Sequence, residues 1–294
     1  MTKSEVQDLI DKIDSHKGKM SKGQKAISQY IINNYDKAAF MTAAKLGATV
    51  GVSESTVSRY AVQLGYEGYP ELQKALQGLI KNKLTSLQRM ELSGDHANAQ
   101  VLKSVLKTDI SNIKETLESI DYDAFDRVVN NICSASNIYI LGVRSAAPAV
   151  EFMGYYLNFM FNNVHIITSG INDILEQLCH INEDDILITF SFPRYAKRAV
   201  DGAHFARQKG ACVVAITDSE YSPLVPYADE VIYTKSDMAS FVDSLAAPLS
   251  IINALLIAIG NTKKTQVMDS FHNLETIWNK YGIYQKREAS EDKD

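Results

Sequence analysis

The alternation of apolar and polar positions divides the chain into two regions with different predicted structure. In the first region, apolar residues recur at helical spacing over residues 23–34 and 71–92, which are therefore predicted to be helices. Residues 42–64, which lie between them, predict a helix, a tight turn and a second helix. Apolar side chains form a seam that these two short helices bury together, namely Leu46, Val50, Val52, Val57 and Tyr60.

Small and capping residues place the turn of this unit. Gly47 allows the two helices to pack closely, Gly51 fits the turn, and Ser53 is a good N-cap for the second helix. A unit of this kind presents a helix to the major groove of DNA, so the first region is predicted to be an all-α helix-turn-helix domain. A plain helical hairpin is the alternative, but the small, turn, apolar and exposed positions all agree with the DNA-binding interpretation. The predicted DNA-binding residues are Ser53, Ser55, Thr56, Ser58 and Arg59, with Lys22 and Lys25 as candidates for phosphate contacts.

After residue 121 the pattern changes to short apolar strands that alternate with longer helical segments. The predicted strands cover residues 137–141, 164–168, 185–190, 212–217 and 230–233. The predicted helices cover residues 146–161, 172–180, 196–209 and 241–260. This alternation predicts an α/β domain with a doubly wound, five-stranded parallel sheet flanked by helices. Such sheets bind ligands beyond the carboxyl ends of their strands, which directs attention to the loops that follow them.

Two of these loops carry groups that suit an anion. Gly142-Val143-Arg144-Ser145 follows the first strand and Ser191-Phe192-Pro193-Arg194-Tyr195 follows the third, and each opens a helix. Free N–H groups at a helix N-terminus attract anions, an arginine adds a charged fork, and a serine adds a hydroxyl. The predicted ligand-binding residues are Gly142, Arg144, Ser145, Ser191 and Arg194. The alternative is that the serines cap helices and the arginines, including Arg198, pair with surface carboxylates.

Length and charge support a division into two domains. A chain of 294 residues is longer than one compact domain usually needs. We predict a helix-turn-helix domain over residues 1–92, a helical connection over residues 93–121, an α/β domain over residues 122–284 and a disordered tail over residues 285–294. The net charge is +5 over residues 1–90 and −10 over the remainder, and a modestly basic end is consistent with contacts to DNA phosphates.

Cysteine content and hydropathy narrow the possible cofactors, cellular compartment and membrane association of the protein. The three cysteines lie far apart without metal-ligand or redox spacing, and an odd number argues against a disulfide framework. We therefore expect no metal, no cofactor and a reducing, cytoplasmic compartment. The first residues are too charged for a secretion signal and no apolar run is long enough to span a bilayer, so no membrane partner is expected.

Two stretches resemble one family of bacterial regulators. Gly-Val-Ser-Glu-Ser-Thr-Val-Ser-Arg at 51–59, followed by Leu-Gly-Tyr-Glu-Gly-Tyr-Pro at 64–70, is similar to the reading helix of the RpiR/MurR-type transcriptional regulators and the segment after it. Residues 138–218, which end in Ala-Ile-Thr-Asp, are similar to the core of a sugar isomerase (SIS) domain. The resemblance implies a DNA-binding domain followed by a SIS domain. It also implies that the SIS domain senses a phosphosugar or related metabolite and drives assembly into homodimers or homotetramers.

The chain departs from the usual SIS pattern at the two ligand loops. Arg144 stands where the family has a second glycine, and Pro193 and Arg194 replace part of a serine-rich turn. The resemblance implies that Ser145 and Ser191 still occupy phosphate-binding serine positions. With two arginines, the pocket suits a sugar phosphate or a sugar acid as the effector.

These features predict a transcriptional regulator without enzymatic activity, whose partners are a double-stranded DNA operator and a small carbohydrate effector. The competing class is a SIS-type sugar-phosphate isomerase, which needs a base near the sugar. Its candidate bases, Glu151, His165, His180 and His204, have no spacing that suggests shared work. A third class, a structural DNA-binding protein without an effector, leaves more than half of the chain without a task. A dimer that presents two reading helices to successive major grooves predicts a near-palindromic or directly repeated operator.

Overall fold

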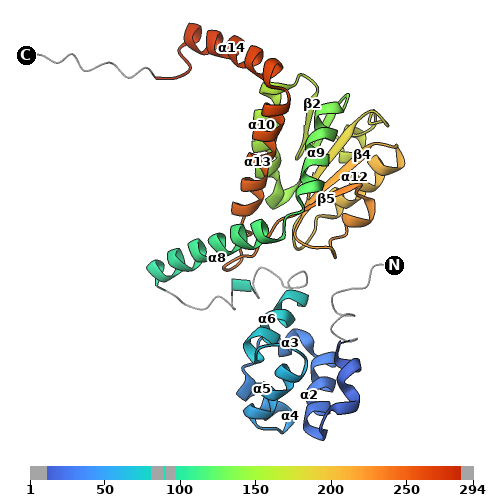
Figure 1. Cartoon of the computed structure of the whole chain (residues 1–294), viewed down its shortest axis with the longest axis vertical. Helices are drawn as coiled ribbons and strands as arrows, with labels where there is room; N and C mark the ends of the chain where they lie inside the picture. The colour runs from blue at the N-terminus through green and yellow to red at the C-terminus, as the bar shows by residue number, and fades with distance from the viewer. Residues whose placement is uncertain (1–11, 81–88, 91–96, 286–294) are drawn as a thin grey trace, which may run out of the picture.

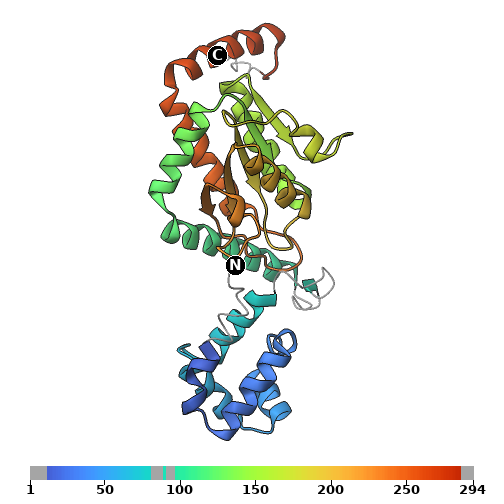
Figure 2. The same ribbon diagram turned by 90° about the vertical axis from the view of Figure 1, so that its right-hand side faces the viewer.

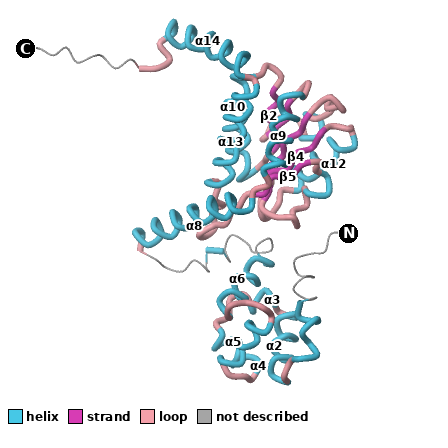
Figure 3. Tube along the Cα trace, viewed as in Figure 1, coloured by secondary structure: helices cyan, strands magenta, loops and turns pink. Residues whose placement is uncertain are grey.

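A helical domain and an α/β body make up the computed structural model, which describes residues 12–80, 89–90 and 97–285 (Figure 1). Each part has its own buried core. One apolar cluster draws its residues from Ile13 to Leu76, and two others draw theirs from Val128 onward. The secondary-structure colouring of Figure 3 separates the all-helical part from the part that contains strands. The predicted order of an all-α domain followed by an α/β domain is confirmed.

Short helices around one apolar core form the helical domain. They are η1 (Lys17–Lys19), α2 (Lys22–Asn33), α3 (Tyr35–Ala38), α4 (Ala43–Val50), α5 (Glu54–Gln63) and α6 (Tyr69–Ile80). Tyr60 of α5 is fully buried, and its phenolic oxygen accepts a hydrogen bond of 3.0 Å from Ser28 Oγ of α2. Burial raises the pKa of Tyr60 to about 12. The core therefore fixes which side of α5 faces inward.

The turn between α4 and α5 is built as the sequence predicts. Gly51 has a φ of +74°, a left-handed conformation that suits glycine. A Cβ atom on Gly47 would lie 2.7 Å from the carbonyl oxygen of Val52, so only glycine permits this approach of the two helices. Ser53 caps α5, because its hydroxyl accepts a hydrogen bond of 3.3 Å from the backbone N–H of Thr56.

A five-stranded parallel sheet with the order β2-β1-β3-β4-β5 forms the centre of the α/β body. The strands are β1 (Ile138–Leu141), β2 (Val164–Ile167), β3 (Ile186–Phe190), β4 (Cys212–Thr217) and β5 (Glu230–Tyr233). The helices are α8 (Asn98–Ser119), α9 (Tyr122–Ser134), η2 (Arg144–Ala146), α10 (Ala147–Met160), α11 (Ile174–Gln177), α12 (Lys197–Gln208), η3 (Val225–Tyr227), α13 (Ala246–Thr262) and α14 (Lys264–Tyr281). Figures 1 and 2 show helices on both faces of the sheet. The doubly wound topology is therefore confirmed.

One apolar cluster covers each face of the sheet. The first joins inward residues of α9, α10 and α13 to one set of strand side chains. The second joins α11 and α12 to the alternate set. The strand order reverses between β1 and β3, since the chain leaves β1 for β2 on one side and leaves β3 for β4 on the other. Ligands bind at such a reversal in sheets of this class.

The structure corrects several expected helix boundaries. The helix predicted over residues 172–180 is limited to α11, and the one predicted over residues 241–260 begins only at Ala246. There the Ser244 hydroxyl accepts a hydrogen bond from the Ala246 backbone N–H, as a cap would. Helices α9 and α14 were not among the predicted elements. The helix predicted over residues 71–92 corresponds in its first part to α6, which ends at Ile80. Residues 81–88 and 91–92 of the predicted helix lie outside the described residues.

The expected connecting helix, α8, is attached to the α/β body by specific hydrogen bonds. Asn112 of α8 is buried, and its side-chain amide donates 2.7 Å to the Asp237 carbonyl and accepts 3.1 Å from the Asp237 backbone N–H. Thr116 Oγ1 accepts a hydrogen bond of 2.9 Å from the Lys235 backbone N–H. The predicted disordered tail lies outside the described residues except for residue 285.

Across the described ranges, no single helix has both the length and the apolar composition needed to cross a bilayer. The pair α13 and α14 meets that test only when counted together, and it is bent by 102°. Cys133, Cys179 and Cys212 are all free thiols.

Candidate functional site

The exposed side of α5 carries the residues predicted to contact DNA. Ser55 and Arg59 are exposed on successive turns, and the Arg59 Nε donates a hydrogen bond of 3.2 Å to the Ser55 carbonyl. Thr56 and Ser58 are partly buried at the edges of this face. Ser53 is exposed at the start of the helix, within 2.9 Å of the hydroxyls of Ser55 and Thr56. The polar face is therefore open to solvent at the N-terminal turns of α5.

The two candidate phosphate contacts on α2 differ in position. A Cβ on Gly23 would lie 3.0 Å from Val52 Cγ1 and 3.7 Å from Thr56 Cγ2, so the start of α2 packs beside the start of α5. Lys22 and Lys25 are both exposed. At about 100° of rotation per residue, Lys22 lies beside Gly23 on the helix surface, whereas Lys25 lies nearly opposite. Lys22 is thus nearer to the reading face than Lys25.

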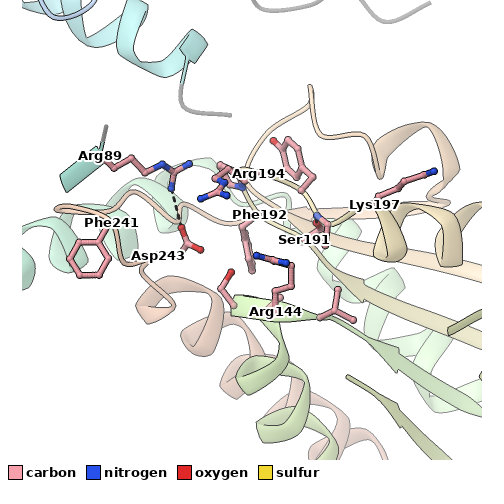
Figure 4. Close-up of a pocket in the computed structure, with 14 residues that line it drawn as sticks. Arg89, Arg144, Ser191, Phe192, Arg194, Lys197, Phe241 and Asp243 are labelled. Atoms are coloured by element: carbon pink, nitrogen blue, oxygen red, sulfur yellow. Dashed lines mark hydrogen bonds and ion pairs between the residues drawn. The ribbon is translucent and has the colours of Figure 1, made fainter. Parts of the chain in front are cut away.

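In the α/β body, a cavity of about 490 Å³ lies at the carboxyl ends of β1 and β3 (Figure 4). Four of the five predicted ligand-binding residues line it, namely Arg144, Ser145, Ser191 and Arg194. Gly142 is buried beneath the loop, where a Cβ would lie 2.6 Å from Val150 Cγ2. The structure therefore brings both predicted loops to one site.

Two of the arginines that line the cavity have unusual backbone conformations. Arg144 has a φ of +59° and Arg194 a φ of +71°, in the left-handed region that costs a non-glycine residue roughly 1–2 kcal/mol. At the position of Arg144 the SIS pattern has a glycine, which adopts this conformation without strain. Strain of this kind persists where the surrounding structure holds it, and it concentrates at binding sites.

The buried serine of the second loop is held by backbone and side-chain contacts. Ser191 Oγ accepts a hydrogen bond of 3.3 Å from the Ala196 backbone N–H. Thr217 Oγ1, from the end of β4, donates a hydrogen bond of 2.7 Å to the Ser191 carbonyl. The bond from Ala196 uses Ser191 Oγ as an acceptor, so the hydroxyl still has its own proton to donate.

Two helices begin at the cavity, and neither has a capping side chain. Ala146 is the N-cap of α10 and Ala196 is the N-cap of α12, and alanine has no side-chain oxygen. In α10 the Ala147 N–H already donates to the Arg144 carbonyl and Pro148 has no N–H, so α12 is the helix with more first-turn N–H groups to offer. Such N–H groups attract anions. The arrangement of arginines, a buried serine hydroxyl and helix N-termini can hold a phosphate or a carboxylate.

The cavity also contains residues that the sequence pattern did not single out. Arg89 reaches it from the chain between α6 and α8, Lys197 lines it from the first turn of α12, and Phe241 and Asp243 line it from the segment before α13. Lys197 directly follows the predicted loop and could have been found by extending it. By contrast, Arg198 lies outside the cavity lining and forms an ion pair of 2.9 Å with Asp173, which is the surface-pair alternative.

The four candidate bases of the isomerase hypothesis are not among the lining residues of this cavity. Glu151 lies near Thr168 beyond β2, and the His165 ring stacks on Tyr139 at 4.5 Å. His180 is exposed, and His204 packs against Tyr227. Among the described residues, no group of three or more His, Cys, Asp or Glu side chains is placed to hold a metal ion.

Comparison with known protein families gives two matches in sequence order. The helix-turn-helix domain of the rpiR family matches residues 7–83, and the SIS domain matches residues 131–258. Together they span the helical domain and most of the α/β body.

Relatives named as helix-turn-helix-type transcriptional regulators match along most of the chain. The regulator HexR of Pseudomonas aeruginosa is 25% identical over 217 residues, which are 72% of this chain and 74% of HexR. An uncharacterised helix-turn-helix-type regulator of Clostridium perfringens is 22% identical and covers 82% of this chain and 87% of its own length.

Two solved structures show the same fold. The sugar isomerase domain of an RpiR transcription factor from Sphaerobacter thermophilus has a TM-score of 0.58 at 24% identity and covers 60% of this chain and 99% of its own. Vibrio vulnificus NanR, solved with ManNAc-6P, has a TM-score of 0.57 at 19% identity and covers 93% of this chain and 98% of its own. With an rpiR-type helix-turn-helix domain followed by a SIS domain, the chain belongs to the RpiR-type transcriptional regulators.

Proposed function

We propose that the SIS cavity binds a phosphosugar or a related sugar acid, and that its occupancy changes the affinity of the helix-turn-helix domain for operator DNA. The observation that carries this proposal is the convergence of Arg144, Ser191 and Arg194 with the N-terminus of α12, which has no side-chain cap, at the ends of β1 and β3. A phosphomonoester carries up to two negative charges, which arginine forks and helix N-termini bind well. The complex of Vibrio vulnificus NanR with ManNAc-6P supports the phosphosugar class.

The proposed DNA contacts lie on the exposed face of α5. We propose that Arg59 and Ser55, which are both exposed, reach base edges, while Ser53, Thr56 and Ser58 flank them at the start and edges of the helix. Lys22 and Lys25 supply charge for backbone phosphates. Because base-edge contacts specify sequence and phosphate contacts position the protein, Arg59 is the leading candidate for sequence recognition.

We further propose that the regulator acts as a homodimer or a dimer of dimers, with α8 at the contact between copies. Apolar side chains recur every three or four residues on one side of α8 and are strongly exposed, namely Leu102, Leu106, Ile110, Ile113 and Leu117. An apolar groove of about 360 Å³ continues from α8 onto α9 and α13. A contiguous apolar surface of this kind marks an interface, and a second copy supplies a matching stripe.

The dimer defines the form of the operator and the place of action. Two copies of α5 would enter successive major grooves, so a near-palindrome or a direct repeat is expected. Because its target is chromosomal DNA, we propose that the regulator acts in the cytoplasm. The SIS-type isomerase remains the competing function, but the lining of the cavity does not favour it, since the four candidate bases lie elsewhere.

A ligand screen tests the effector proposal. The full chain is titrated with glucose 6-phosphate, N-acetylmannosamine 6-phosphate and 6-phosphogluconate, and with the unphosphorylated sugars, by thermal shift and calorimetry. At least one anionic sugar should stabilise the α/β body, and the stabilisation should grow with the ratio of its concentration to its Kd. Arg144→Ala and Ser191→Ala should lose the response. Arg198→Ala is the matched control and should keep it, because Arg198 pairs with Asp173 outside the cavity.

The second arm measures the effect on DNA. An operator is selected from random duplexes with the wild-type chain, and its Kd is measured with and without the stabilising sugar. A change of about 5- to 150-fold is typical for coupled sites. If no anionic sugar stabilises the chain, or if a stabilising sugar leaves operator affinity unchanged, the proposed function is wrong. Turnover of a sugar phosphate into an isomer would instead establish the competing function.

A further inference from the structure

Arg89 enters the SIS cavity from outside the SIS sequence. It is helical and lies between α6, which ends the helical domain at Ile80, and α8, which begins at Asn98. Its side chain is only 5% exposed. The contacts of the guanidinium include Asp243 Oδ1 at 3.5 Å and Met238 Sδ at 2.9 Å, both from Nη1 (Figure 4). The chain that joins the two domains therefore places a buried cation in the cavity of the second.

A second cation faces Arg89 across the same space. Figure 4 shows the guanidinium groups of Arg89 and Arg194 close together, on the side of the cavity where Asp243 lies. Burial lowers the pKa of Arg89, Asp243 opposes this effect, and the charge of Arg194 lowers the pKa further. Two like charges at a shared site repel each other unless an anion lies between them. Because Arg89 is buried and lies near the charge of Arg194, a further anion at this place would lower the electrostatic energy of the site.

We propose that Arg89 is an effector-binding residue, and that the anionic group of the effector takes over from Asp243 as its partner. The inference rests on the effector pocket proposed above. Arg89 and Asp243 form an ion pair among the residues that line the cavity. In the occupied state, the anion bridges Arg89 and Arg194 and releases Asp243.

The position of Arg89 makes this exchange a link between the domains. The other lining residues lie in the α/β body, whereas Arg89 belongs to the connection that leads back to α6. A ligand shifts an equilibrium by its differential affinity for the two arrangements. A contact between the effector and the chain that joins the two domains would make the affinity for the effector depend directly on how that chain is arranged.

Ligand affinity is the first test. Kd values are measured by calorimetry for inorganic phosphate and for the anionic sugar that gives the largest stabilisation in the screen, with the full-length chain throughout. Arg89→Met should raise the Kd by about 10- to 100-fold, the range expected for a lost hydrogen bond to a charged group. Asp243→Asn should lower the Kd, because it removes the competing carboxylate. Arg198→Ala should leave it unchanged, since Arg198 lies outside the cavity lining.

The double variant Arg89→Met with Asp243→Asn separates a binding role from a structural one. It removes both charges together, so no unpaired buried carboxylate is left to disturb the fold. If Arg89 binds the effector, the double variant keeps a normal Tm and still binds the probe weakly. Wild-type affinity in the double variant would show that Arg89 serves only to neutralise Asp243, and would overturn the inference.

Operator binding is the second test. In the double variant, the operator Kd should no longer depend on a saturating concentration of the sugar. A dependence equal to that of the wild type would overturn the proposed link between domains. The two proposals fail differently. Absence of any probe binding to the wild type overturns the effector pocket and this inference together, whereas loss of binding in Arg144→Ala with wild-type Kd in Arg89→Met overturns this inference alone.

Discussion

Replacing Gly47 by alanine tests the close approach of α4 and α5 on which the reading helix depends. The added Cβ would lie 2.7 Å from the Val52 carbonyl oxygen and 3.3 Å from the Ser53 carbonyl carbon, both in the backbone of the turn. These atoms cannot rotate away as a side chain would, so the helices must separate. Overpacking costs about 1–3 kcal/mol, while alanine in place of a helical glycine gains at most about 1 kcal/mol. The clash outweighs the helix propensity, and a net loss of about 1–2 kcal/mol is expected for the helical domain.

Thermal unfolding followed by two probes measures this loss. Trp278, the chain's single tryptophan, lies in α14, so its fluorescence follows the α/β body, whereas far-ultraviolet circular dichroism follows both parts. Gly47→Ala should lower the transition of the helical domain by roughly 4–16 °C and leave the tryptophan transition in place. Gly260→Ala is the matched control in α13, where the nearest atom is 4.0 Å away, and it should not destabilise. A Gly47→Ala variant as stable as the wild type, with normal operator binding, would refute the close-approach argument.

Three further predictions follow from the same geometry. Arg59→Ala should weaken binding to the selected operator by about 1–3 kcal/mol relative to random DNA. Equal losses of affinity for both kinds of DNA would exclude Arg59 from base recognition. Lys22→Ala should weaken binding to every duplex and reduce the slope of log K against log salt by about 1, with a smaller effect from Lys25→Ala. Ile110→Asp on α8 should convert the dimer to monomers in sedimentation, whereas Ser111→Asp, on the other side of the helix, should not; a dimeric Ile110→Asp variant would place the interface elsewhere. The pKa of Tyr60 is raised from 10.0 to about 12, so folding favours the neutral phenol. The contribution of this phenol to the stability of the helical domain is complete below pH 10 and is lost as the pH rises toward 12. Tyr60→Phe should reduce the loss of stability of the helical domain at alkaline pH. A pH dependence of stability equal to that of the wild type would show that Tyr60 does not cause this loss.

The helix-turn-helix unit was predictable because its signals are local. Gly47, Gly51 and Ser53 each act on backbone within a few residues, and the structure shows each doing so. The five strands were likewise predictable from short apolar runs, because β1, β3 and β4 are buried on both faces, although the edge strands β2 and β5 are partly exposed. Helix ends were less predictable, because the helix predicted from residue 241 begins only at Ala246, and Ser244 before it donates a hydrogen bond to Asp109, which is distant in the sequence.

Only those residues of the candidate effector site that directly follow a strand were predictable from the sequence. Arg144 and Ser191 come directly after β1 and β3, so strand order alone brings them together. Arg89 and Asp243 fall in segments predicted as helices, residues 71–92 and 241–260, and helical periodicity does not say which distant residues their side chains meet. Their meeting depends on how α8 packs against α13 and on the chain before and after it, and no local pattern encodes such a contact.

The hydrogen bonds of α8 decide how a change in the cavity would spread. The segment between β5 and α13, residues 234–245, lines the cavity through Phe241 and Asp243. The same segment is fastened to α8 at three places: Lys235 N–H to Thr116, Asp237 to Asn112, and the Ser244 hydroxyl to Asp109 at 2.6 Å. At about 0.5–1.5 kcal/mol for each bond, breaking them would cost as much as or more than a typical coupling energy of about 1–3 kcal/mol. A ligand that moved Asp243 would therefore move α8 with the segment rather than tear it away. Because α8 also carries the proposed dimer stripe, such a movement would alter the spacing of the two reading helices as well as the position of Arg89.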